Sequence, residues 1–66
     1  MEVRSITEPK FEIYRDVAGK FRFRIVAPNG EIIAVSEAYE TKQGCVNGIE
    51  SVMKNAPRAI IQDRSE

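Results

Sequence analysis

The stretch FRFRIVAPNGEIIAVS, residues 21–36, decides the fold of this chain of 66 residues. Before residues 28–31 (PNGE), apolar side chains alternate along the chain with the period of a half-buried β-strand, and a second apolar run follows. An Asn-Gly pair between apolar strands favours a two-residue hairpin turn, because both residues tolerate positive φ. The sequence therefore predicts an antiparallel hairpin with strands over residues 20–27 and 31–36.

This turn also predicts which residues face each other across the hairpin. Directly opposed residues lie on the same side of a sheet. The expected pairs are Ala27–Ile32, Val26–Ile33, Ile25–Ala34 and Arg24–Val35.

A further strand is predicted on the N-terminal side of this hairpin. Residues 10–16 alternate in the same way, and residues 17–19 (Val-Ala-Gly) then form a three-residue loop with a left-handed backbone at Gly19. This loop pairs residues 10–16 with the central strand. The expected pairs are Ile13–Phe23, Glu12–Arg24 and Tyr14–Arg22.

The C-terminal half contains one helix. Thr41 is a suitable N-cap for a helix over residues 42–55, and Pro57 ends it. Its apolar stripe consists of Cys45, Ile49, Val52, Met53 and Ala56. Residues 59–62 (AIIQ) are expected to form a short fourth strand, which has little to pack against in its own chain. The predicted fold class is α+β, with the order β-β-β-α-β and the helix packed on one face of a three-stranded antiparallel meander.

The predicted register divides the apolar side chains between two faces. The helix should cover a first face made of Phe11, Ile13, Phe21, Phe23, Ile25, Ala27, Ile32 and Ala34. The second face should be polar in a monomer, since water contacts that side of the sheet. Instead it carries Tyr14, Val26, Ile33 and Val35, edged by Glu12, Arg22 and Arg24. An apolar patch with a charged rim is typical of a contact surface, and the alternative is an ordinary scatter of surface residues.

Size supports the same interpretation. A chain of this length buries only about 60% of the surface that its unfolded form exposes, and it has no disulfide or metal to stabilise it. We therefore expect a homodimer. The expected interface residues are Tyr14, Val26, Ile33, Val35, Ile60 and Ile61.

Composition excludes several kinds of function. The chain has no His and one Cys, so it lacks the commonest metal ligand and general base and can form no intrachain disulfide. Lys and Arg together number 10, as do Asp and Glu, and this zero net charge argues against a dedicated nucleic-acid binder. No apolar run is long enough for a membrane span, and no secretory h-region is present. We expect a cytoplasmic protein that is not an enzyme and needs no cofactor or metal.

Five features of the sequence are candidate sites. Cys45 is read as a buried hydrophobe rather than a nucleophile, because no His could activate it. The small residues Gly44 and Gly48 let the helix approach the sheet, rather than forming a membrane motif or a phosphate loop. Glu37 and Glu40 are solvated loop charges rather than an acid–base pair. An active site at a dimer interface, using Tyr39, Lys42 and Glu37, has no positive support.

The fifth feature is a basic cluster on the second face. Lys20, Arg22 and Arg24 beside Tyr14 could hold single-stranded nucleic acid by charge and stacking. The competing interpretation pairs Glu12 with Arg24 and places Arg22 over Tyr14. A ligand or nucleic-acid contact at Lys20, Arg22 and Arg24 is the alternative function.

Four sequence blocks carry a family resemblance. FEIYRD (11–16), GKFRFR (19–24), NGEIIA (29–34) and GIESVMKNA (48–56) resemble the YegP-like family of small uncharacterised proteins. The resemblance implies a three-stranded sheet, a helix and a short terminal strand, in proteins with one repeat or two in tandem. It implies that a single-repeat chain dimerises, and it supplies no biochemical activity. A Trp often present in the second strand of the family is absent here, where Phe21 and Phe23 are the only aromatic residues.

The expected organisation is therefore simple. Residues 1–9 should form a flexible N-terminal arm, residues 10–62 a single YegP-like domain, and residues 63–66 a C-terminal tail.

Overall fold

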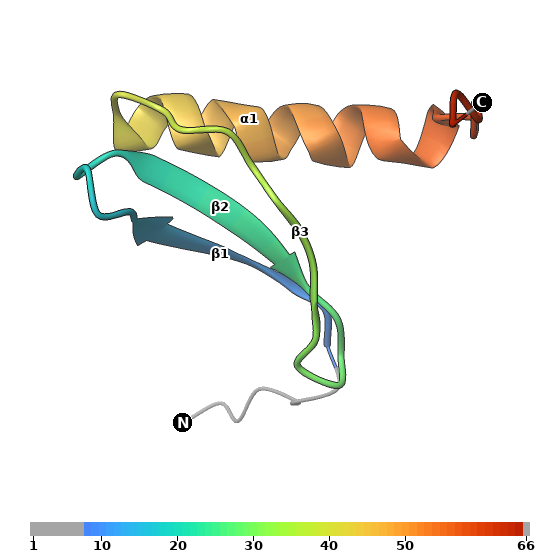
Figure 1. Ribbon diagram of the computed structural model, residues 1–66, viewed down its shortest axis with the longest axis horizontal. Coiled ribbons are helices and arrows are strands. Elements are labelled where there is room, and N and C mark those ends of the chain that lie inside the picture. Colours follow the sequence, from blue (N-terminus) through green and yellow to red (C-terminus); the bar gives the residue numbers. More distant parts are fainter. Residues whose placement is uncertain (1–7, 66) are drawn as a thin grey trace.

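A three-stranded antiparallel sheet with one helix across it makes up the fold, in a computed structural model that describes residues 8–65 (Figure 1). The elements are β1 (Lys10–Arg15), β2 (Phe21–Val26), β3 (Ile32–Val35), helix α1 (Lys42–Asn55) and a 3₁₀ turn, η1 (Ala56–Arg58). The strands lie in the order β1-β2-β3, so β2 is central. Residues 1–7 of the predicted arm, and Glu66, lie outside the described residues.

The first hairpin has the predicted loop and the predicted register. Gly19 has φ of 82°, and its N–H donates to the carbonyl oxygen of Asp16 over 2.9 Å. The N–H of Asp16 donates in turn to Lys20 O over 2.9 Å, which closes a three-residue loop. The predicted pairs Ile13–Phe23, Glu12–Arg24 and Tyr14–Arg22 are all confirmed.

The second hairpin differs from the prediction by one residue. Gly30 has φ of 91°, but Asn29 does not have positive φ, so the two-residue turn is wrong. The N–H of Gly30 donates to Ala27 O over 2.8 Å, and the N–H of Ala27 donates to Glu31 O over 2.7 Å. The reason is Pro28, which has no N–H and therefore cannot close a two-residue loop against Glu31. The hairpin closes at Ala27 instead, and the loop has three residues.

A β-bulge in β3 compensates for the longer loop. Val26 pairs with Ile32, so the predicted pairs Ala27–Ile32 and Val26–Ile33 are wrong. The register then shifts by one residue, and the pairs Ile25–Ala34 and Arg24–Val35 are as predicted. Ile33 is the additional residue of the bulge. Because opposed residues share a side, Ile32 lies on the side of Val26 and not on the predicted helix face.

Helix α1 begins where the sequence predicts. Thr41 has the extended backbone of an N-cap, and its hydroxyl accepts a hydrogen bond from Gly44 N–H over 3.0 Å. The helix contacts the central strand β2, and Figure 1 shows its C-terminal half running beyond the sheet. Within residues 8–65, no helix is long and apolar enough to cross a lipid bilayer.

Tyr39 fills the space between α1 and β2. Its backbone forms a bridge with Phe21, with N–H to O distances of 2.7 and 2.9 Å. Its ring stacks on Phe23, with 6.2 Å between the ring centroids. A Cβ on Gly48 would overlap the Tyr39 hydroxyl and would lie 2.8 Å from Tyr39 Cζ. Gly48 is therefore needed for close approach, as predicted, whereas the atoms nearest a Cβ on Gly44 would belong to Thr41 and Tyr39 and not to a strand.

The core that results is small. Phe23, Val26 and Cys45 are the buried hydrophobic residues of the described chain. Phe11 adds an edge-to-face contact with the Phe23 ring, at 5.9 Å between centroids. Ile13, predicted to lie under the helix, stays more than one-third exposed. The helix therefore covers the centre of the predicted first face and leaves part of it open.

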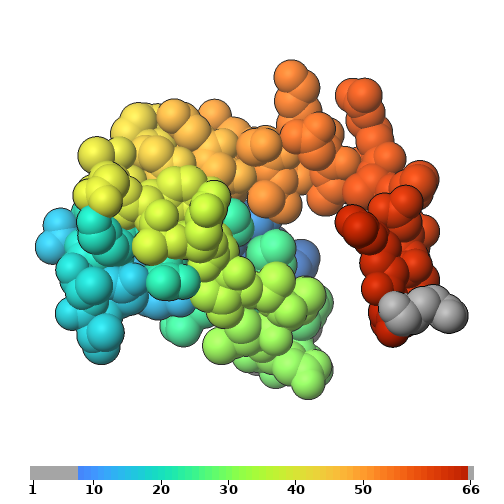
Figure 2. All heavy atoms as spheres, turned by 45° about the horizontal axis from the view of Figure 1, so that its top comes forward, coloured from blue at the N-terminus to red at the C-terminus, as the bar shows by residue number. Residues whose placement is uncertain are grey.

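The C-terminal residues do not form the expected strand within this chain. The 3₁₀ turn η1 follows α1 directly, and residues 59–65 have no regular structure. A gap separates them from the hairpin between β2 and β3 in the space-filling view (Figure 2). Ala59, Ile60, Ile61 and Gln62, called here the C-terminal segment, are all exposed.

Candidate interaction surface

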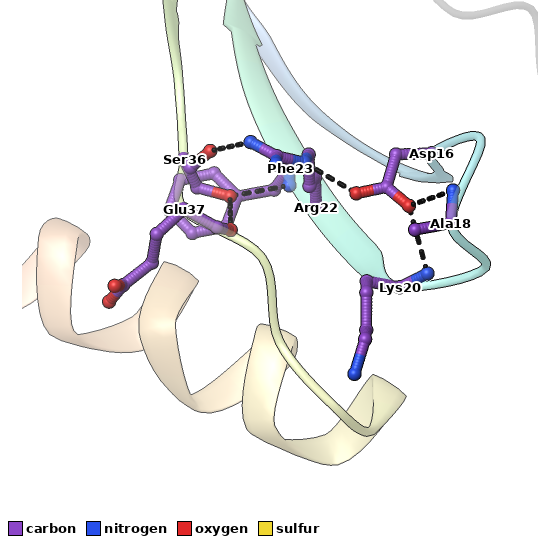
Figure 3. A network of polar contacts seen from close by, with 7 residues as sticks. All are labelled: Asp16, Ala18, Lys20, Arg22, Phe23, Ser36 and Glu37. Atoms are coloured by element: carbon purple, nitrogen blue, oxygen red, sulfur yellow. Dashed lines mark hydrogen bonds and ion pairs between the residues drawn. The ribbon is translucent and has the colours of Figure 1, made fainter.

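Asp16 organises a polar network at the loop end of the sheet (Figure 3). Its Oδ1 accepts hydrogen bonds from the backbone N–H groups of Ala18 and Lys20, both over 2.9 Å. Its Oδ2 accepts one from Arg22 Nε over 2.7 Å. Arg22 also donates through a terminal nitrogen to Ser36 O over 3.1 Å. The first hairpin is thereby tied to the residue that follows β3.

The electrostatics of this network follow from its contacts. The hydrogen bond from Arg22, assisted by the backbone donors of Lys20 and Ala18, lowers the pKa of Asp16. The same contact raises the pKa of Arg22. Sequence reasoning missed this role of Asp16, although an Asp directly before a Gly-containing loop is the usual signal for a side chain that bonds the loop backbone. The network stabilises the hairpin and does not form a binding site, because its donors and acceptors already bond one another.

Ser36 fastens the segment between β3 and α1, residues 36–41, to the sheet. Its hydroxyl oxygen accepts from Phe23 N–H over 2.9 Å, and the hydroxyl donates to Glu37 O over 2.8 Å. The side chain of Glu37 is exposed, whereas Glu40 forms an ion pair with Lys20. These contacts give the two carboxylates separate environments, as expected for loop charges.

A second ion-pair cluster lies along β1 and β2. Arg24 Nε donates to Glu12 Oε1 over 2.8 Å, as the predicted pairing requires, and Lys10 Nζ lies 3.2 Å from Glu12 Oε2. These two cations, Arg24 first, lower the pKa of Glu12. Arg24 also covers the Tyr14 ring, with 4.9 Å from its guanidinium carbon to the centroid.

The expectation that Arg22 covers Tyr14 was therefore wrong. Arg22 is held by Asp16, and Arg24 occupies the diagonal position over the ring. Each cation of the predicted nucleic-acid contact, Lys20, Arg22 and Arg24, has a carboxylate partner in its own chain. The cluster consequently presents balanced charge to the solvent.

The apolar surface lies along β3, the outer strand on the far side of β2 from β1. Ile32, Ile33 and Val35 are 52%, 64% and 53% exposed. These three residues are called here the β3 surface. Val35 lies opposite Arg24, and Ile32 lies opposite Val26.

The structure brings together only some of the six predicted interface residues. Ile33 and Val35 are open, and Ile60 and Ile61 in the C-terminal segment are 87% and 97% exposed. Tyr14 is partly covered by Arg24. Val26 is buried within the chain, in the central strand between its partners on β1 and β3, so it has little surface left for contact. Ile32, which sequence reasoning assigned to the helix face, takes its place because the second loop has three residues and not two.

Cys45 is fully buried in α1, and burial raises the pKa of its thiol. Its environment is that of an apolar core residue. The described residues contain no group of three or more side chains able to hold a metal ion.

Similar proteins were compared with the chain. Residues 16–63 match the family model described as "Domain of unknown function (DUF1508)". A "UPF0339 protein" of Treponema denticola is 67% identical over 52 residues, which are 79% of this chain and 90% of that protein. A solution structure of a Haloferax volcanii protein is 43% identical, with a TM-score of 0.80, and the match covers 86% of this chain and 97% of that one.

One relative is considerably longer. A "UPF0339 protein in ptx operon 5'region" of Stutzerimonas stutzeri is 64% identical over 47 residues, which are 71% of this chain but 42% of that protein. None of these three names describes an enzyme. With the solved neighbour sharing its fold and the family model spanning β2, β3 and α1, this chain belongs to the uncharacterised DUF1508 (UPF0339, YegP-like) family.

Proposed function

We propose that this protein is a non-enzymatic interaction module that works as a homodimer. The observation that carries the proposal is the contrast between three buried hydrophobic residues and four open ones among the predicted interface residues, Ile33, Val35, Ile60 and Ile61. Apolar surface that is open on a small domain usually marks a contact site.

The edges of the sheet favour β3 as the side of contact. The outer strand β1 carries the charged residues Lys10, Glu12 and Arg15, and charge protects an edge strand from pairing. The outer strand β3 has the sequence IIAV, without a charge or a proline. Its backbone is therefore the edge that can accept another strand, and its bulge bends the strand without charging it.

The C-terminal segment supplies a strand of the matching chemistry. Its sequence, AIIQ, is short, apolar and free of charge, and it has no strand partner among residues 8–65. We therefore propose that the fourth strand expected from the sequence forms on the β3 edge of a second copy, and that the second copy does the same in return.

The energetics permit this arrangement. Full burial of an Ile or Val side chain contributes about 1.5–3 kcal/mol. Four such side chains from each of two chains give a total comparable with or above the association cost of about 4–15 kcal/mol.

The nucleic-acid alternative has weaker support. Lys20, Arg22 and Arg24 would each have to leave a carboxylate partner before binding phosphate. We expect no binding of single-stranded DNA or RNA at low salt, where phosphate contacts are strongest.

Light scattering over a range of concentrations tests the proposal. The wild-type chain should have a molar mass near twice 7.5 kDa. Val35→Asp and Ile60→Asp should each lower the mass toward that of one chain. Val17→Asp is the matched control, because Val17 is an exposed apolar residue in the first loop, away from β3. A wild-type mass of 7.5 kDa at all concentrations would contradict the proposal.

A further inference from the structure

The connection between α1 and the C-terminal segment is a tight turn. The chain keeps winding through η1 (Ala56–Arg58), with Pro57 at its start, and the N–H of Ala59 donates to Ala56 O over 3.1 Å. Ala56 itself still donates to Val52 O, so the turn continues directly from the helix. A 3₁₀ turn rises about 2 Å per residue, so three residues advance the chain by only about 6 Å.

The turn leaves the C-terminal segment away from its own sheet. Ala59 is the first extended residue, with φ of −76° and ψ of 140°. Ile60 and Ile61 follow at once and are almost fully exposed. Figure 1 places the C-terminal end beyond the far end of α1, and Figure 2 shows the open gap between it and the β2–β3 hairpin.

The length of chain available explains this position. To pair with β3 of its own chain, the segment would have to descend from the helix layer to the sheet layer, about 10 Å for elements of these diameters. An extended residue spans at most about 3.6 Å, so the descent needs about three extended residues. Ala59 is the only extended residue between η1 and Ile60.

We infer that η1 is a hinge that holds Ile60 and Ile61 off their own sheet and so directs them to a second copy. This inference rests on the proposed function. Pro57 stabilises the hinge because its ring fixes φ near the value that the turn requires and reduces the freedom of the unfolded chain. The short hinge thus favours exchange of the segment over a closed monomer, in which the same strand would cover its own β3.

A hinge of greater length tests the inference. We would insert Gly-Gly-Ser-Gly between Arg58 and Ala59, which adds up to about 14 Å of reach. The dimer dissociation constant should rise at least tenfold, with the circular dichroism spectrum retained. In that monomer the amides of Ile60 and Ile61 should be protected from hydrogen exchange, because the segment has returned to its own β3. The control is the same insertion between Gln62 and Asp63, which lengthens the chain without lengthening the hinge.

The outcomes separate the hinge from the proposed function. A wild-type dimer whose dissociation constant is unchanged by the hinge insertion overturns the hinge and leaves the dimer intact. A monomeric insertion variant in which the amides of Ile60 and Ile61 exchange freely also overturns it, since the segment has then lost one partner without gaining the other. A wild-type chain that is monomeric at every concentration overturns both.

Discussion

Replacement of Gly48 by alanine would test whether the Tyr39 ring sets the distance between helix and sheet. The new Cβ would overlap the Tyr39 hydroxyl, and it would lie 2.8 Å from Tyr39 Cζ and 3.3 Å from Phe23 Cε2. The ring cannot move away freely, because it stacks on Phe23 and its backbone bridges to Phe21. The substitution should therefore force a shift of the ring or of the helix.

Two opposing effects determine the magnitude. Alanine in a helix interior is favoured over glycine by about 1 kcal/mol. Overpacking of a contact of this kind costs about 1–3 kcal/mol. We expect Gly48→Ala to lower the free energy of unfolding by about 1 kcal/mol on balance. For a denaturation slope of about 1 kcal/mol per molar urea, the unfolding midpoint should fall by about 1 M.

The assay is urea unfolding followed by circular dichroism at one fixed chain concentration, because self-association would otherwise move the midpoint. In a Tyr39→Leu background the overlapping atoms are gone, and Gly48→Ala should then stabilise the helix by about 1 kcal/mol. Asn47→Ala, at the neighbouring exposed position, is the control and should change stability by no more than about 0.5 kcal/mol. The reasoning is refuted if Gly48→Ala stabilises the wild-type chain, or if its effect is the same with Leu at position 39.

Three further predictions concern charges and the thiol. The pKa of Asp16 is lower in the folded chain than its ordinary value of 3.8, so its ionisation stabilises the fold above that pH and this contribution is lost as the pH falls toward the folded value. Asp16→Asn should therefore remove part of the stability loss seen below about pH 4 in acid titrations. The buried Cys45 should react with a thiol reagent only as fast as the chain unfolds, and rapid labelling of the native protein would contradict its burial. Glu40→Gln should change the free energy of unfolding by less than about 1 kcal/mol, because its ion pair with Lys20 is exposed, and a larger loss in urea unfolding would indicate an additional contact.

Local signals were sufficient for the first hairpin and the helix start. The Gly19 loop depends on one left-handed residue, and its register follows from the loop length. Thr41 likewise acts within one turn of the helix that it caps. Such features depend on neighbours in the sequence, so the sequence alone could predict them.

The second hairpin was mispredicted because one local signal was given too much weight. Asn29-Gly30 suggested a two-residue turn, but the absent N–H of Pro28 rules out its closing hydrogen bond. That part could have been predicted. The bulge at Ile33 could not, because it reconciles the loop with a register fixed by packing elsewhere in the sheet. The position of Tyr39 against Gly48 is also a contact between distant segments, which no pattern in either segment indicates.

The second face was predicted as one surface, and the structure divides it into two halves with different capacity for binding. On β1 and β2 the charged residues are paired within the chain, so any new partner would have to compete with contacts already made, such as that between Arg24 and Glu12. The apolar residues of β3 are instead exposed to water. Their burial against a partner would therefore contribute favourable free energy to binding. Ion pairs of this kind mainly influence specificity and rate of association, whereas apolar burial supplies the free energy. Recognition by this protein should accordingly be determined along β3 and the C-terminal segment, with the charged half limiting which molecules can approach.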